Sequence, residues 1–150
     1  MTEVLFYHLT GQTPEQVLPS LLHKSLDRGW RAVVQGTSEE RIEALDAHLW
    51  TWRDDSFLPH GMWQDAEAAE QPILLTIDEK NLNNAAVRFL IEGAEMPADT
   101  AAYERVVLIF DGDDSEAVAA ARAHWSKAKS AGFEVTYWQP DEKGVWRREA

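Results

Sequence analysis

The chain has 150 residues, a length that fits one domain burying roughly two thirds of its unfolded surface. It has no cysteine, which excludes disulfides, thiolate metal sites and a cysteine nucleophile. Its net charge of −12 disfavours strong direct nucleic-acid binding, because an acidic surface repels phosphates. The amino-terminal apolar run is too short to span a bilayer and carries Glu3, unlike a secretory signal. We therefore expect a single domain over residues 1–150, cytoplasmic and without membrane attachment.

The first predicted helix carries its own start and stop signals. Thr13 has the form of an N-cap, Pro14 suits the first helical position, and Gln16 completes a capping box. Gly29 is the expected stop. Pro19 fits a helix interior poorly and leaves a kink or a late start open.

Strands are expected on both sides of this helix, over residues 3–9 and 30–36. Thr37 with Glu40 then resembles a second capping box, which predicts another helix. Its apolar positions recur at helical spacing and are Ile42, Leu45 and Leu49.

An aromatic segment, residues 49–61, follows where the helical pattern stops. Its bulky apolar side chains stand among charged and turn-forming residues and include Trp50, Trp52, Phe57 and Leu58. This mixture predicts an interface loop, in which proline keeps Phe57-Leu58-Pro59 out of regular structure and exposed. The alternative is that several of these side chains fold back as a lid on a sheet edge, and for Trp50 the two interpretations carry equal weight.

The second half of the chain continues the alternation. Short apolar runs predict strands over residues 73–77, 86–91 and 103–110, then a helix over 116–131, then strands over 133–138 and 144–147. Strands alternating with helices predict a three-layer α/β domain whose sheet is mostly parallel with an antiparallel carboxy-terminal edge.

Acidic residues 111–114 follow the clearest buried strand. Clustered carboxylates there can hold Mg2+, so a small nucleotide- or metal-dependent enzyme using Asp111 and Asp113 is the second functional hypothesis. A turn with Asp113 or Asp114 as helix N-cap is favoured over it. The chain has no Gly-x-x-x-x-Gly-Lys-Ser/Thr, Gly-x-Gly-x-x-Gly, His-Glu-x-x-His or Gly-x-Ser-x-Gly motif. We therefore expect no cofactor.

The helix over 116–131 places an aromatic residue between two cations. Arg122 lies three residues before Trp125 and Lys129 four residues after it, so all three share one side of the helix. Such a surface can receive an apolar side chain on the ring and a carboxylate on Arg122. A buried Trp125 that only anchors the core is the alternative.

The surroundings of this helix are basic although the chain is acidic. Residues 122–148 hold six cations and three anions, a balance of +3 that leaves −15 for the rest of the chain. A basic patch on an acidic protein suits a short acidic peptide better than a long polyanion, although uneven charge without a partner explains it equally well. The six cations are Arg122, Lys127, Lys129, Lys143, Arg147 and Arg148.

The chain resembles the chi subunit family of bacterial DNA polymerase III, an accessory protein of the clamp loader. The most specific part is Ser-Phe-x-Pro-His at residues 56–60, after Leu49-Trp50; residues 64–99 match more loosely. The other matching segments are Phe6-Tyr7, residues 31–34, Leu45-Asp46 and residues 122–133.

The resemblance implies a non-catalytic adaptor with a Rossmann-like fold and two contact faces. In that family one face binds the acidic C-terminal tail of single-stranded DNA-binding protein, and its matching positions are Arg122, Trp125 and Lys129. A further basic position of the family is Ser126 here, so the affinity is expected to be lower unless Lys127 compensates.

The other face implied by the resemblance binds the psi subunit of the clamp loader, for which a repair helicase competes in some bacteria. The matching positions are Trp50, Phe57, Pro59 and His60. The resemblance thus predicts that the chain links the clamp loader, or a helicase, to single-stranded DNA-binding protein.

Overall fold

The computed structural model describes residues 2–51 and 58–150. Its main elements, in chain order, are β1 (Glu3–Leu9), α1 (Pro14–Asp27), β2 (Ala32–Gln35), α2 (Glu39–Trp50), β3 (His60–Met62), β4 (Ile73–Thr76), β5 (Val87–Leu90), β6 (Arg105–Asp111), α3 (Ser115–Ser130), β7 (Glu134–Pro140) and β8 (Trp146–Arg148). Two short 3-10 turns, Ala68–Glu70 and Thr100–Ala102, precede β4 and β6.

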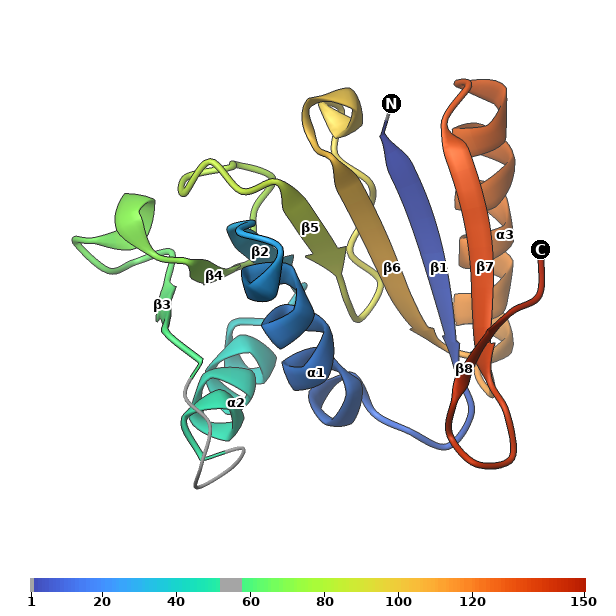
Figure 1. The fold of residues 1–150 in the computed structure, drawn as a ribbon, viewed down its shortest axis with the longest axis horizontal. Helices are drawn as coiled ribbons and strands as arrows, with labels where there is room; N and C mark the ends of the chain where they lie inside the picture. Colours follow the sequence, from blue (N-terminus) through green and yellow to red (C-terminus); the bar gives the residue numbers. More distant parts are fainter. Residues whose placement is uncertain (1, 52–57) are drawn as a thin grey trace.

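The strands described form an eight-stranded sheet in the order β3-β4-β2-β5-β6-β1-β7-β8. All neighbours pair in parallel except β7 and β8, which are antiparallel. Helices α1 and α2 lie on one face and α3 on the other (Figure 1). The predicted three-layer α/β fold with an antiparallel carboxy-terminal edge is therefore confirmed. None of the described helices is long and apolar enough to cross a bilayer.

Alternating residues of the strands are buried in two separate apolar layers, one on each face of the sheet. In β1, Leu5 and Leu9 pack with α1 and α2, whereas Val4 and Phe6 pack beneath α3. This period of two is the reason that one strand can be buried on both sides.

The start of α1 follows the predicted capping box. The Thr13 hydroxyl accepts a hydrogen bond from the Gln16 amide at 3.3 Å, and the Gln16 side chain accepts one from the Thr13 amide at 2.9 Å. The helix begins at Pro14 and runs through Pro19, so the late start is wrong. It ends as predicted, with Gly29 in the left-handed region at φ +78°.

The capping box predicted for α2 is wrong by one residue. Ser38 is the N-cap, and its hydroxyl accepts from the Arg41 amide at 3.4 Å. Thr37 instead donates to the Glu92 carbonyl, at 3.0 Å, in the connection after β5. A contact that is distant in sequence therefore decides between two neighbouring residues that both suit an N-cap.

Part of the aromatic segment is regular structure that the sequence did not indicate. His60–Met62 forms β3, which pairs in parallel with β4 through His60 and Ile73. Leu58 is 1% exposed and belongs to the core, so its predicted exposure is wrong. Burying Leu58 anchors the chain just before this edge strand.

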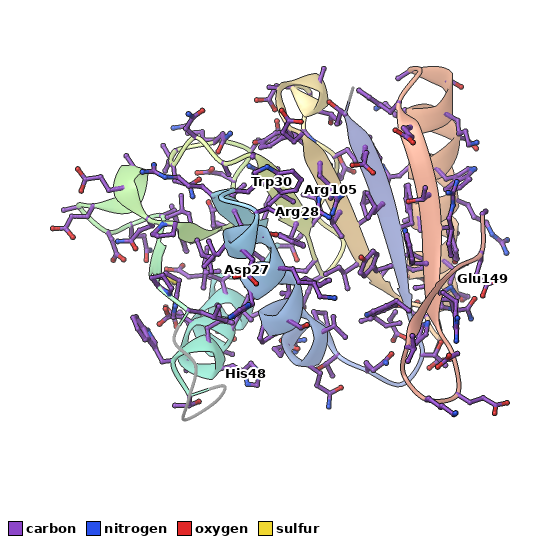
Figure 2. The ribbon with its side chains drawn as sticks, in the orientation of Figure 1. Asp27, Arg28, Trp30, His48, Arg105 and Glu149 are labelled. Atoms are coloured by element: carbon purple, nitrogen blue, oxygen red, sulfur yellow. The ribbon has the colours of Figure 1, made fainter. Side chains whose placement is uncertain are left out.

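Arg28 and Arg105 pack against the Trp30 ring near the amino-terminal ends of the strands (Figure 2). The Arg28 and Arg105 guanidinium carbons lie 5.0 and 5.3 Å from the Trp30 ring centroid. Arg105 also pairs with Glu3 at 3.1 Å. The stack joins the end of α1 to the first residues of β1 and β6.

Arg88, in β5, is fully buried, which is unusual for an arginine. Its Nε and Nη2 donate to Gln35 Oε1 on β2, at 3.1 and 2.7 Å. Nη1 donates to the Tyr103 hydroxyl at 3.0 Å and to the Lys80 carbonyl at 3.4 Å, and Nη2 also donates to the Asp78 carbonyl. All five N–H groups of the side chain thus have acceptors.

Replacing Arg88 with alanine should lower the free energy of unfolding by about 3–5 kcal/mol. The reason is that the oxygen atoms that accept hydrogen bonds from Arg88 would remain buried without a donor. Urea denaturation followed by tryptophan fluorescence measures this loss. The exposed Arg122→Ala is the control and should change stability by less than about 0.5 kcal/mol. Equal losses in the two variants would contradict this role for Arg88.

Candidate partner-binding surfaces

Three residues of α3 form the first candidate surface, which we call the α3 surface: Arg122, Trp125 and Lys129. Trp125 is half-buried, and its ring meets the buried Phe6 ring edge-on, with centroids 5.5 Å apart. The Lys129 ammonium lies 5.3 Å from the centroid of the Trp125 ring. The indole therefore contributes to the core and also contacts a cation at the surface.

The two cations of the α3 surface are exposed and available. Among the residues that the structure describes, neither Arg122 nor Lys129 forms an ion pair. Arg147, by contrast, pairs with Asp141 at 3.1 Å and is partly neutralised. Arg122 and Lys129 thus bring two exposed cations to one side of α3, with no neutralising carboxylate in the part of the chain that the structure describes.

The helix geometry settles which neighbours share this surface. Ser126 is exposed and lies four residues after Arg122 and three before Lys129, so it sits between them on the same side. Lys127 is two residues from Trp125, about 200° around the helix, and points away. Lys127 therefore lies outside the α3 surface.

Tyr137 of β7 lies beside the α3 surface, although no motif in the sequence indicates this. Its ring meets Trp125 edge-on, with centroids 6.0 Å apart. Its hydroxyl lies 2.5 Å from His8 Nδ1. Burial raises the pKa of Tyr137, and the nearby charge of Arg122 opposes that rise. Strand alternation gives the side of the sheet on which Tyr137 lies, but the pairing of Tyr137 with Phe6 is needed to bring it to Trp125.

His8 fills the space behind Tyr137. Its ring packs edge-on against Phe110, with centroids 5.3 Å apart, and its Nε2 faces Gly112. A Cβ at residue 112 would overlap the His8 ring, so glycine is needed there. The absence of a side chain after β6 thus allows His8 to reach Tyr137.

The second candidate surface lies at the end of α2. Trp50 is 50% exposed, and its ring centroid is 4.1 Å from that of His60. Pro59 is half-buried beside them, and Phe57 lies outside the described residues. The structure therefore brings Trp50 and His60 together and leaves part of the Trp50 ring accessible.

His60 is buried, and its ring packs against the Trp50 ring. Its Nδ1 is 2.7 Å from the Leu58 carbonyl, and its Nε2 is 3.0 Å from the Asp46 carboxylate. Both partners are acceptors, so each ring nitrogen donates when it carries a proton. These contacts fix the ring that supports Trp50.

The carboxylates after β6 accept hydrogen bonds from backbone amides close to them in the sequence. Asp111 Oδ1 accepts from the Asp113 amide at 2.9 Å, and Asp114 is the N-cap of α3, as one of the two predicted alternatives. No group of three or more metal-ligating side chains occurs among the residues described. The hypothesis of an enzyme using Asp111 and Asp113 gains no support from these contacts.

A cavity of about 550 Å3 opens at the carboxyl ends of β1, β5 and β6, on the opposite flank of α3 from Arg122. Glu92, Asp111, Asp114 and Glu116 lie around it. Arg41 is bound to Glu92 at 3.0 Å, and burial lowers the pKa of His124, so the cavity wall is predominantly negative at neutral pH. Such a wall repels the phosphates of a nucleotide.

Three matches with known proteins bear on the identity of the chain. The family described as DNA polymerase III chi subunit, HolC, matches residues 1–136. A Rickettsia prowazekii protein named probable DNA polymerase III subunit chi is 28% identical over 121 residues, covering 74% of this chain and 71% of the relative. The DNA polymerase III subunit chi of Pseudomonas aeruginosa is 32% identical over 82 residues, covering 53% of this chain and 56% of the relative.

These matches define the class of protein as a replication accessory subunit of a DNA polymerase. The chain belongs to the DNA polymerase III chi subunit family. The resemblance inferred from the sequence is therefore confirmed at the level of the family.

Proposed function

We propose that this chi-family chain is a non-catalytic adaptor that binds the acidic C-terminal tail of single-stranded DNA-binding protein on the α3 surface. It thereby links the DNA polymerase III clamp loader, or a helicase, to that protein. The observation that carries the proposal is the position of the Lys129 ammonium over Trp125, beside an Arg122 that has no ion-pair partner among the described residues.

This surface matches the chemistry of an acidic peptide with an apolar side chain. Arg122 can bind a carboxylate through two parallel hydrogen bonds, and Lys129 adds a second positive charge. Trp125 offers an apolar ring that Phe6 holds from behind. The −12 net charge disfavours a long polyanion in the same place, so contact with DNA would be indirect.

The double variant Arg122→Ala/Lys129→Ala should bind the tail peptide about tenfold more weakly, because both attractive charges are lost. Fluorescence anisotropy of the labelled peptide measures the affinity. The variant Lys24→Ala/Lys80→Ala makes the same change in net charge away from α3 and should bind like wild type. The interaction should also weaken with salt, since surface charges are screened over about 8–10 Å near physiological ionic strength. Wild-type binding no tighter than that of the α3 double variant contradicts the proposal.

Ser126→Lys should strengthen tail binding by about two- to fivefold at low ionic strength, because it adds a cation between Arg122 and Lys129. The same titration measures the gain. Ala44→Lys, on the exposed side of α2, adds an equal charge elsewhere and is the matched control. An equal gain in both variants would mean that net charge, not the α3 surface, governs binding.

We propose the end of α2 as the second contact face, which binds the psi subunit of the clamp loader or a competing repair helicase. Trp50, Phe57, Pro59 and His60 are the residues that the family pattern assigns to it. The described part supports this role through the half-exposed Trp50 ring, which His60 backs at 4.1 Å. Exposed aromatic anchors supply much of the binding energy at protein interfaces.

Trp50→Ala should weaken binding of the psi subunit by about tenfold or more, because it removes an aromatic anchor. Surface plasmon resonance with purified psi measures the change. Leu82→Ala removes another exposed apolar side chain, from the turn before β5, and should leave the affinity unchanged. Equal binding by Trp50→Ala and wild type would exclude Trp50 as an anchor of this face.

A further inference from the structure

Asp46 of α2 holds the His60 ring from the side of the helix. Its Oδ1 lies 3.0 Å from His60 Nε2, and its side chain is 31% exposed, whereas that of His60 is fully buried. The Asp46 carbonyl lies 3.3 Å from the same nitrogen. On the other side of the ring, Nδ1 is 2.7 Å from the Leu58 carbonyl. A carboxylate is a stronger acceptor than a carbonyl, which favours a proton on Nε2 and a hydrogen bond to Asp46.

The ring held in this way lies against Trp50. The two ring centroids are 4.1 Å apart, and the ring planes are inclined by 40°. Asp46 and Trp50 are four residues apart on α2, so they lie on the same side of the helix. Trp50 is the last residue of the helix, where the backbone frays most readily. The contact with His60 therefore ties the end of α2 to β3, which lies next to it (Figure 1).

We propose that Asp46 is a positioning residue of the second contact face: through His60, it fixes the Trp50 ring in one orientation before a partner binds. This inference rests on the proposed function, since it concerns the same face. An aromatic anchor that is already ordered loses less side-chain entropy on binding than a mobile one. Asp46 therefore raises the affinity for the partner through Trp50.

Asp46→Ala removes the carboxylate at a helix position, where alanine is well tolerated. We expect the psi subunit to bind this variant about two- to tenfold more weakly in surface plasmon resonance, the range for one net hydrogen bond. Asp46→Asn keeps an acceptor oxygen and should lose less affinity than Asp46→Ala. The matched control is Glu40→Ala, which removes an equal charge from an exposed position about 240° around the same helix and should bind like wild type.

The Trp50 ring also reports on its own position when no partner is present. In proton–nitrogen correlation spectra, the indole N–H signal of Trp50 is assigned by its loss in Trp50→Ala. This signal should shift in Asp46→Ala and stay in place in Glu40→Ala, because only the first variant releases the His60 ring. An unchanged Trp50 signal in Asp46→Ala would overturn the positioning role. Asp46→Leu, which also lacks an acceptor, should give the same shift and replaces Asp46→Ala if thermal unfolding shows that the alanine variant does not fold.

A double-mutant cycle with Trp50→Ala separates positioning from direct contact. If Asp46 acts through Trp50, Asp46→Ala has no further effect on psi binding in the Trp50→Ala background. A full effect in that background would assign Asp46 a direct contact with the partner and overturn the positioning role. If Asp46→Ala binds like wild type while Trp50→Ala binds more weakly, the inference fails and the proposed contact face stands. If Trp50→Ala binds like wild type, the proposed face itself fails, and the Trp50 signal still decides whether Asp46 positions the ring.

Discussion

The buried guanidinium group of Arg88 is the constraint on which the centre of the sheet depends. A charge can remain in a dry interior only when every polar hydrogen has an acceptor, and here the acceptors come from β2, from the β4–β5 connection and from Tyr103 just before β6. The interaction therefore fixes three segments that are distant in sequence. Tyr103 responds to the same environment, because burial raises its pKa while the charge of Arg88 opposes the rise. An apolar residue at position 88 would pack against the strands without specifying where these polar groups must lie.

A rigid central sheet separates the two candidate contact faces. Helix α2, which carries Trp50, lies over the β3–β4 end of the sheet, whereas α3 lies on the opposite face over β6, β1 and β7 (Figure 1). In each face a buried aromatic group supports the more exposed one: His60 stands behind Trp50, and Phe6 behind Trp125. Two partners bound at such distant sites would not compete for space. The separation also means that no residue is shared between the faces, so each can be altered alone.

Local patterns in the sequence were sufficient for most of the fold, because helix caps and strand alternation depend on near neighbours. Thr13 and the choice of Asp113 or Asp114 as a cap follow from such rules. The features that the sequence did not indicate depend on pairing between distant segments. Strand β3 exists because β4 offers it an edge, and Arg88 is buried because four acceptor atoms from distant segments surround it. For the α3 surface, helical spacing brought Trp125 together with its flanking cations. Tyr137 was missed because its contact depends on strand register, which a single sequence does not contain.

The charges on the two flanks of α3 give an approaching peptide a direction. One flank carries Arg122 and Lys129, while the other borders the cavity surrounded by Glu92, Asp111, Asp114 and Glu116. An acidic peptide on α3 would be favoured on the first flank over the second, where Lys127 offsets only part of the charge of the four carboxylates. The strongly negative remainder of the chain adds to this repulsion everywhere except at the basic patch. The net charge of −12 disfavours nucleic acid over most of the surface. For the same reason, a short acidic segment that bound to α3 would be restricted to the side that carries Arg122 and Lys129.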